Sequence, residues 1–368
     1  MNQSQTNEAG AETNEPGLSK LIVRALEPLN LESPAACLET FITPSDKFYV
    51  RNHFPMPQVS LDMWKLAIEG QVDNQIELSY EQISQLPAHT VTCTLECAGN
   101  SRIYLENAPG VQWSAGAIGT AKWPGVRLSE ILKLAGLCPE AREVILQGAD
   151  LGIPDDAPAP AEPIHFARSL TLAEAQAPDV LLAYKMNGEA LTATHGFPLR
   201  AIVPGFYGMA SVKWLSKIEV SATKFNGYYQ TADYAYLQEA TDRTAPTPIK
   251  NARVKSWLLS PLLDQVIPAG TRYRIHGAAW SGSADEIVKV EVSTDSGTSW
   301  STAHLSGENI SNCWRFFEYV WQTPNEPGPY TVMTRATDSA GNSQPFHHEE
   351  NCGSYVIDFV IPVSVRVV

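Results

Sequence analysis

The spacing of apolar side chains between residues 30 and 240 predicts strands and helices that alternate along the chain. Residues 127–135 place apolar side chains at positions 128, 131, 132 and 135, which is the spacing of an amphipathic helix. Short apolar segments typical of strands lie at residues 63–69, 143–147, 180–184 and 199–203. Because strands and helices are interleaved in this way, we expect a mixed α+β domain here and not a sandwich.

The pattern changes beyond residue 250, where helical periodicity largely disappears. Expected strands lie at residues 273–279, 288–292, 314–321 and 330–337. Turns that contain glycine follow two of them, at Asp295-Ser-Gly297 and Asp338-Ser-Ala-Gly341. Short strands at this spacing indicate an Ig-like β-sandwich of about 110 residues.

Composition also marks where these regions meet and where the chain begins to fold. Residues 240–249 are polar and contain two prolines, as linkers often do. Residues 1–17 are rich in Asn, Gln, Glu and Thr, a composition typical of a disordered tail. We therefore expect a disordered tail over 1–17, a first domain over 30–243 and a second over 246–368.

The charge and hydropathy of the 368-residue chain exclude some classes of function. The net charge is −14 and no basic block is present, which argues against a nucleic-acid partner because phosphate binding needs clustered Lys and Arg. No apolar run approaches the length of a membrane span, so no membrane partner is expected. No secretory signal is visible, so we expect a cytoplasmic protein, or a periplasmic one if the sequence is a processed form.

The cysteines are scattered and form no recognisable framework. They stand at positions 37, 93, 97, 138, 313 and 352, with no CxxC pair and no zinc-ligand spacing. We expect five of them to be buried small hydrophobic residues. Cys97 is the exception, because residues 92–96 alternate like a strand and Ala98-Gly99-Asn100 then turns sharply. A thiolate at such a strand end can point into a cleft and hold a metal.

Cys97 also lies in a motif that identifies a family. The sequence Glu96-Cys-Ala-Gly-Asn100, followed by Arg102, Trp113 and residues 116–123, resembles the core of the sulfite oxidase family, as does His195-Gly-Phe-Pro-Leu-Arg200. The resemblance implies a molybdopterin-binding domain of the sulfite oxidase fold, followed by an Ig-like dimerisation domain that forms a homodimer. It implies a molybdenum–molybdopterin cofactor with Cys97 as the metal ligand, which agrees with the affinity of soft thiolates for soft metals.

The resemblance also implies a role for each residue of the site. Four polar or cationic groups within residues 195–213, interrupted by Gly and Pro, suit the binding of an anion. The residues expected to bind the cofactor are Tyr49, Asn52, His53, Cys97, Asp150, His195, Arg200, Ser211, Val212 and Lys213. The residues expected to orient an anionic substrate are Arg51, Arg102, Trp113 and Tyr234. Taken singly, each of these side chains would more often be structural.

Three positions depart from the family pattern. Ser101 stands where the family has the first of two arginines, and Cys352 stands where the animal enzymes have a further arginine. Ala278 replaces a tyrosine in the second domain, a change that we expect to be structural. The substrate pocket is therefore expected to be less positive than that of an animal sulfite oxidase. This pattern fits a bacterial sulfite oxidase-like branch.

The function that these observations favour is the oxidation of sulfite to sulfate. The chain has no GxGxxG, no CxxCH and no His-Pro-Gly-Gly, so we expect no haem, nicotinamide or flavin. Electrons would then pass to an external acceptor such as cytochrome c, and a basic carrier is compatible with the acidic chain. Two alternatives remain open: the same cofactor acting on another S- or N-oxo substrate, and a non-catalytic binding protein with a degenerate site. A thiol-protease site at Cys97 is disfavoured, because no nucleophile motif surrounds it.

Overall fold

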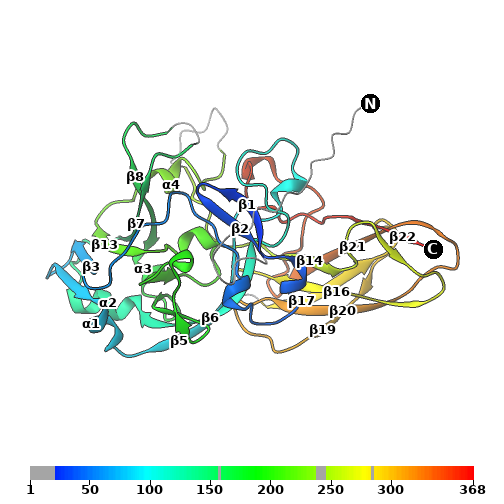
Figure 1. Ribbon diagram of the computed structural model, residues 1–368, viewed down its shortest axis with the longest axis horizontal. Helices are drawn as coiled ribbons and strands as arrows, with labels where there is room; N and C mark the ends of the chain where they lie inside the picture. The colour runs from blue at the N-terminus through cyan, green and yellow to red at the C-terminus, as the bar shows by residue number, and fades with distance from the viewer. Residues whose placement is uncertain (1–20, 156–158, 238–245, 283–285) are drawn as a thin grey trace.

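The computed structural model describes residues 21–155, 159–237, 246–282 and 286–368, so the expected tail over 1–17 lies outside the described residues. Figure 1 shows two lobes, a mixed lobe of strands and short helices and a lobe of strands alone that ends at the C-terminus. A β-hairpin near the N-terminus lies beside the junction of the lobes (Figure 1). The expected order of an α+β domain and a β-sandwich is confirmed.

The first lobe is built on two sheets. The five-stranded sheet has the order β4 (Ile76–Ser79), β3 (Lys65–Gly70), β13 (Leu215–Ser221), β7 (Glu143–Gly152) and β8 (Ile164–Thr171). The four-stranded sheet has the order β12 (Arg200–Ile202), β9 (Leu181–Ala183), β6 (Ile118–Arg127) and β5 (His89–Glu96). A small ladder joins β10 (Lys185–Met186) and β11 (Glu189–Ala190). The four strands expected in this region are all present.

The helices of this lobe are short, and sequence features explain where they begin and end. Helix α2 (Leu128–Ala135) confirms the predicted amphipathic helix, because its buried residues are those with the predicted spacing. It ends at Gly136, which has a φ of 71°. Helices α1 (Tyr80–Ser84) and α3 (Leu172–Ala175) each begin at a capping box. Helix α4 (Tyr228–Thr231) follows Gly227.

The N-terminal hairpin holds two segments of the site in place. Its strands are β1 (Ile22–Leu26) and β2 (Leu29–Glu32). Leu31 in β2 exchanges backbone hydrogen bonds with Val50, and these bonds fix the segment that follows. The buried carboxylate of Glu32 accepts hydrogen bonds from the backbone amides of Ser114 and Gly116 and pairs with Arg24. These partners offset the free-energy cost of burying the carboxylate.

The second lobe is a sandwich of a four-stranded and a five-stranded sheet. The first has the order β14 (Lys255–Ser260), β16 (Arg272–Trp280), β20 (Arg315–Gln322) and β19 (His304–Ser306). The second has the order β15 (Gln265–Ile267), β22 (Val363–Val367), β21 (Gly328–Asp338), β17 (Ile287–Ser293) and β18 (Ser301–Thr302). Alternate side chains from both sheets form an apolar core that includes Ile275, Val290, Phe317 and Val332.

The two lobes share structure at their junction. The Trp314 indole donates to the backbone oxygen of Phe41 at 3.0 Å, and the Thr94 amide donates to that of Asn312 at 2.8 Å. The described end of the expected linker is packed and not free, since Ile249 is fully buried in the core of the first lobe. Part of the chain after β21 also returns to that core, through Cys352 and Val356. Residue 356 lies far from the first lobe in sequence, so the sequence pattern did not indicate this return.

Among the described helices, none has the length and apolar character needed to cross a membrane.

Cys93, Cys313 and Cys352 are buried as expected, but Cys37 and Cys138 are only half-buried. That part of the cysteine prediction is wrong, because Cys37 ends a short 3-10 helix and Cys138 lies in a loop, and both positions are partly open to solvent.

Candidate active site

Cys97 is held at the end of a strand by backbone hydrogen bonds. Strand β5 ends at Glu96, and the Cys97 amide donates to the Ala117 oxygen at 2.9 Å. The Asn100 amide donates to the Cys97 oxygen at 2.9 Å and closes the predicted turn. The residue is 6% exposed and lines a pocket of the first lobe. Burial raises the pKa of this thiol, while the guanidinium groups of Arg51 and Arg102 oppose that rise.

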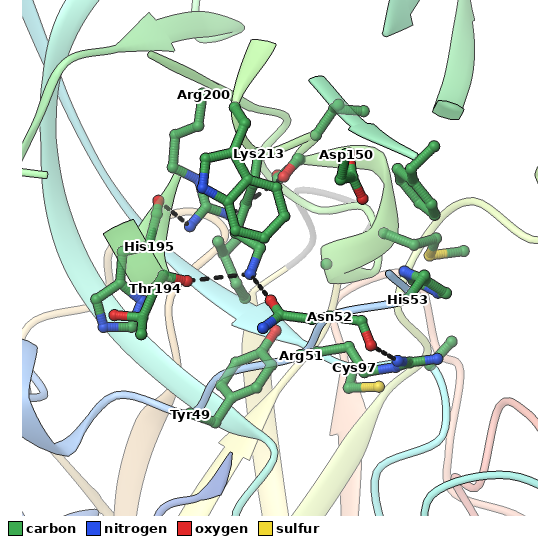
Figure 2. A pocket seen from close by; sticks show the side chains of 18 of the residues that line it. Tyr49, Arg51, Asn52, His53, Cys97, Asp150, Thr194, His195, Arg200 and Lys213 are labelled. Atoms are coloured by element: carbon green, nitrogen blue, oxygen red, sulfur yellow. Dashed lines mark hydrogen bonds between the residues drawn. The ribbon is translucent and has the colours of Figure 1, made fainter. Parts of the chain in front are cut away.

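Most of the predicted site residues surround the same pocket. They come from the segment after the hairpin, the turn after β5, the bulge in β7, β12 with the loops on either side of it, and the segment after α4. Figure 2 shows most of them. The predicted residues that line it are Tyr49, Arg51, Asn52, His53, Cys97, Asp150, His195, Arg200, Ser211, Val212, Lys213 and Tyr234. Residues more than a hundred positions apart in the sequence thus meet at one place.

One wall of the pocket is crowded with buried cations. Lys213 donates to Asn52 Oδ1 and to the Thr194 oxygen, the latter at 3.0 Å (Figure 2). Arg200 donates to the backbone oxygens of His195 and Ser211, each at 3.1 Å. Burial and the neighbouring Arg200 hold the pKa of Lys213 well below its usual value. Burial, Arg200 and Lys213 lower the pKa of His195 to about 3. In addition to burial, the lowered pKa values reflect repulsion between neighbouring positive charges, which a bound anion would offset.

A close approach of the backbone brings these cations together. Gly196 has a φ of 100°, and a Cβ placed there would come within 3.0 Å of the Lys213 Cβ and 3.2 Å of the Arg200 Cβ. A side chain at residue 196 would therefore be strained and would push the two cations apart. The geometry of the pocket therefore requires glycine at this position of the predicted motif.

Several polar atoms of this wall have no partner among the described residues. They are Asn52 Nδ2, Asp150 Oδ1 and Arg200 Nε. Asp150 is turned inward at a bulge in the pairing of β7 with β8, and burial raises the pKa of its carboxyl to about 7, although Lys213 opposes the rise. Leaving buried donors and acceptors unpaired costs about 1–3 kcal/mol each. The wall therefore suits a ligand with both acceptor and donor groups, as a pterin phosphate has, and Cys97 offers that ligand's metal a soft sulfur.

A second wall of the pocket combines an arginine, a phenol and a neutral imidazole. Burial alone would lower the pKa of Arg51, but Tyr234 and Cys97 raise it overall. The Tyr234 hydroxyl shares a hydrogen bond of 2.7 Å with His53 Nε2. Burial, Arg51 and Lys213 hold the pKa of His53 well below its usual value, so this imidazole is neutral near pH 7. Tyr234 has a φ of 47°, and the Asp233 carboxylate accepts a hydrogen bond from its amide at 2.9 Å. This wall presents a fixed cation and a hydroxyl to a small anion.

Arg102 and Trp113 lie behind the pocket wall. The Arg102 guanidinium donates to the backbone oxygens of Ser354 at 2.9 Å and of Val111 at 2.8 Å, and it lies over the Tyr355 ring. It packs so closely on Gly99 that a Cβ there would lie 2.2 Å from Arg102 Nη2. Trp113 is fully buried in the cluster that also contains Cys97. Both residues support the Cys97 turn from behind, so the pocket presents fewer cations than the sequence predicted.

None of the three positions that depart from the family pattern lines the pocket, and Ala278 is buried in a separate apolar cluster. Ser101 is fully buried with a φ of 77°, and its hydroxyl accepts a hydrogen bond from Lys255. Cys352 is buried, and its thiol faces Asn351 and Glu349. Several lining residues were not predicted from the sequence, namely Phe48, Leu95, Ala98, Phe166, Thr194, Gly208, Met209 and Trp214. Most are apolar and carry no chemical signal, although Phe48, Thr194 and Trp214 adjoin predicted residues.

Comparisons with known proteins agree with this geometry. The model of the oxidoreductase molybdopterin binding domain matches residues 53–229, and that of the Mo-co oxidoreductase dimerisation domain matches residues 247–359. The sulfite oxidase of Gallus gallus is 36% identical over 354 residues, which cover 92% of this chain and 75% of that protein. The sulfite oxidase of Arabidopsis thaliana is 34% identical, covering 90% of this chain and 89% of that protein.

Other relatives are longer than this chain. The mitochondrial sulfite oxidase of Drosophila melanogaster is 34% identical, and the match covers 93% of this chain but 62% of that protein. The chain thus spans less than two thirds of the length of some relatives. The crystal structure of the sulfane dehydrogenase SoxCD from Paracoccus pantotrophus matches with a TM-score of 0.79 and 27% identity, covering 98% of this chain and 87% of that chain. The chain therefore carries a molybdopterin-binding domain and a dimerisation domain, and it belongs to the sulfite oxidase family.

Proposed function

We propose that the protein is a molybdenum–molybdopterin-dependent oxidoreductase that oxidises sulfite to sulfate. The observation that carries the proposal is that the Cys97 thiol lines the same pocket as a wall of buried cations with unpaired polar atoms and a second wall with Arg51 and Tyr234. Sulfite oxidases from an animal and a plant are similar over most of the chain. Their activity supports the same reaction class here.

The cofactor side of the site would be formed by the crowded wall. Lys213 and Arg200 would donate to the phosphate and polar ring edge of the pterin, and His195 would contact the same group, since these side chains are buried and close together. Asn52 Nδ2 and Asp150 Oδ1 would gain partners. Tyr49, Ser211 and Val212 line the same wall. Cys97 would ligate the metal, and the bound molybdenum supplies two-electron oxygen-atom transfer chemistry.

The substrate side would be formed by Arg51, Tyr234 and His53. Oxidation of sulfite consumes water and releases two protons and two electrons. Arg51 stays protonated across the working pH range and would hold the anion. The Tyr234 hydroxyl would orient it while sharing its hydrogen bond with the neutral His53. Arg102 and Trp113 would keep the Cys97 turn in place from behind.

The partners belong to the same proposal. Released electrons would pass to an external acceptor such as cytochrome c, and a net charge of −14 favours a basic carrier at low ionic strength. The match of residues 247–359 to a dimerisation domain supports a homodimer.

A second candidate keeps the cofactor and changes the substrate. Arg102 is already bound to two backbone oxygens, so the pocket has less positive charge available for an oxyanion than the sequence predicted. A sulfane dehydrogenase is similar over almost the whole chain. These observations favour a less oxidised sulfur compound as the alternative substrate.

Metal analysis combined with a substrate assay tests the proposal. Purified protein from a host that makes molybdopterin should contain about one molybdenum per chain and should reduce ferricyanide or cytochrome c when sulfite is added. The same chain from a host without molybdopterin synthesis is the control. Molybdenum with turnover of another sulfur compound but not of sulfite would favour the second candidate. Absence of molybdenum from the competent host would overturn both and favour a binding protein.

A further inference from the structure

The sandwich lobe inserts two side chains beneath the turn that carries Cys97. Lys255 in β14 and Trp280 in β16 are directly paired across their strands, so both point to the same face. The Glu96 carboxylate accepts from Lys255 Nζ at 3.1 Å through Oε1 and from the Trp280 indole at 2.8 Å through Oε2. Both members of the ion pair have side chains that are only 3% exposed. Glu96 immediately precedes Cys97 in the chain.

The same lysine holds the far end of the turn. Its ammonium also donates to the Asn100 oxygen at 3.3 Å and to the Ser101 hydroxyl at 3.0 Å. All three of its donors are therefore directed at residues 96–101. Ser101 has a left-handed backbone, which the lysine contact helps to hold in place.

A continuous path of hydrogen bonds connects this ammonium to Cys97. Asn100 Nδ2 donates to Glu96 Oε1 at 3.1 Å, and Asn100 Oδ1 accepts from the Ala117 amide at 3.0 Å. The Ala117 oxygen in turn accepts from the Cys97 amide. The backbone of Cys97 is thus fixed through groups that Lys255 and Trp280 orient.

We propose that Lys255 and Trp280 are positioning residues, through which the sandwich lobe sets the orientation of the Cys97 thiol in the pocket of the other lobe. The second lobe then contributes to the metal site in addition to its role in dimerisation. This inference rests on the proposed function in so far as Cys97 is taken to be the metal ligand. The orientation of the turn itself can be measured without a metal.

The test compares the reactivity of two cysteines in the cofactor-free full-length chain. Cys97 follows β5 and Cys93 lies within it, buried and outside the pocket lining, so Cys93 reports global opening. In Lys255→Met the alkylation rate of Cys97, followed by peptide mass spectrometry, should rise about fivefold or more relative to that of Cys93. Lys289→Met is the matched control, because it removes a lysine ion pair from the surface of the same lobe.

A second variant covers the case in which the buried, unpaired Glu96 prevents folding. Lys255→Met combined with Glu96→Gln removes both charges and leaves no unpaired charge behind. In the molybdenum-loaded protein, either folded variant should also shift the thiolate-to-molybdenum charge-transfer absorption. An equal increase at Cys93 and Cys97, or no increase at either, would reduce Lys255 to a purely structural residue and overturn the inference. If no variant or wild-type protein binds molybdenum, the proposed function fails, while a selective change at Cys97 would still establish the coupling of the turn to the sandwich.

Discussion

The core of the sandwich and the pocket of the first lobe are both buried, but burial has opposite effects on the free energy of folding in the two regions. Ile275, Val290 and Phe317 gain free energy as they leave water. Arg200 and Lys213 lose hydration and repel each other, and together with burial they keep the neighbouring His195 uncharged at pH 7. Burial therefore stabilises the first region, whereas in the second it costs free energy that a bound anion would offset. The contrast indicates that the functional site is the pocket, because burying its charged side chains does not by itself stabilise the fold.

The largest effect should come from removing the sulfur of the pocket. Cys97→Ser keeps the size and hydrogen bonds of the residue but replaces a soft ligand by a hard one. We expect turnover to fall by about a thousandfold or more, with the melting temperature nearly unchanged. Cys93→Ser is the matched control, since Cys93 is fully buried in the same cluster but does not line the pocket. Substantial activity in Cys97→Ser would remove the metal-ligand role.

The next largest effect should come from opening a cavity in the core of the sandwich. Phe317→Ala opens a cavity between the two sheets and should lower the free energy of unfolding by about 3–5 kcal/mol. At temperatures where the variant remains folded, molybdenum content and turnover should stay close to wild type. Denaturant titration and metal analysis measure the two properties. Loss of the cofactor from folded Phe317→Ala would mean that the two regions are not energetically separate.

A smaller effect should follow from deleting one hydroxyl of the substrate wall. Tyr234→Phe removes the bond to His53 but keeps the ring, whose centroid lies 4.6 Å from that of the Tyr355 ring. We expect kcat/KM for sulfite to fall about 10- to 100-fold, as for the loss of one positioned donor. Tyr330→Phe, which removes a tyrosine hydroxyl from the sandwich, should leave steady-state kinetics unchanged. Equal kinetics in both variants would contradict the role of Tyr234.

The smallest effect, taken over one pH unit, is a change in the pH dependence of stability. Burial raises the pKa of Asp150 to about 7, so the folded, cofactor-free chain retains a proton there that the unfolded chain has lost. This carboxyl therefore favours folding at acid pH, and its contribution is lost as the pH rises from about 4 to 7. Asp150→Asn should make the slope of unfolding free energy against pH more positive in that window, by up to about 1.4 kcal/mol per pH unit. Denaturant titrations of the cofactor-free protein at several pH values measure the slope, and parallel curves would contradict the shift.

The sequence pattern predicted those parts of the molecule that depend on local spacing. The periodicity of residues 128–135 and the alternation before Cys97 correspond to α2 and β5. The motif residues that line the pocket were found through the resemblance to the sulfite oxidase family, because each side chain taken singly would more often be structural. The side-chain direction of Arg102 could not be predicted, since it is set by the Ser354 oxygen, which is 252 residues away along the chain. The role of Lys255 was missed for the same reason, because a lone lysine at the start of a strand carries no signal.

The return of residues 352–356 to the first lobe, together with the Lys255–Glu96 pair, limits how this architecture can be divided. A polypeptide that ended before the sandwich would expose Ile118 and leave the Glu96 carboxylate without its cation. Recombination that exchanged one lobe for that of a distant relative would have to carry matching partners on both sides of the junction. The two lobes are therefore expected to be inherited and to diverge together, as one evolutionary unit.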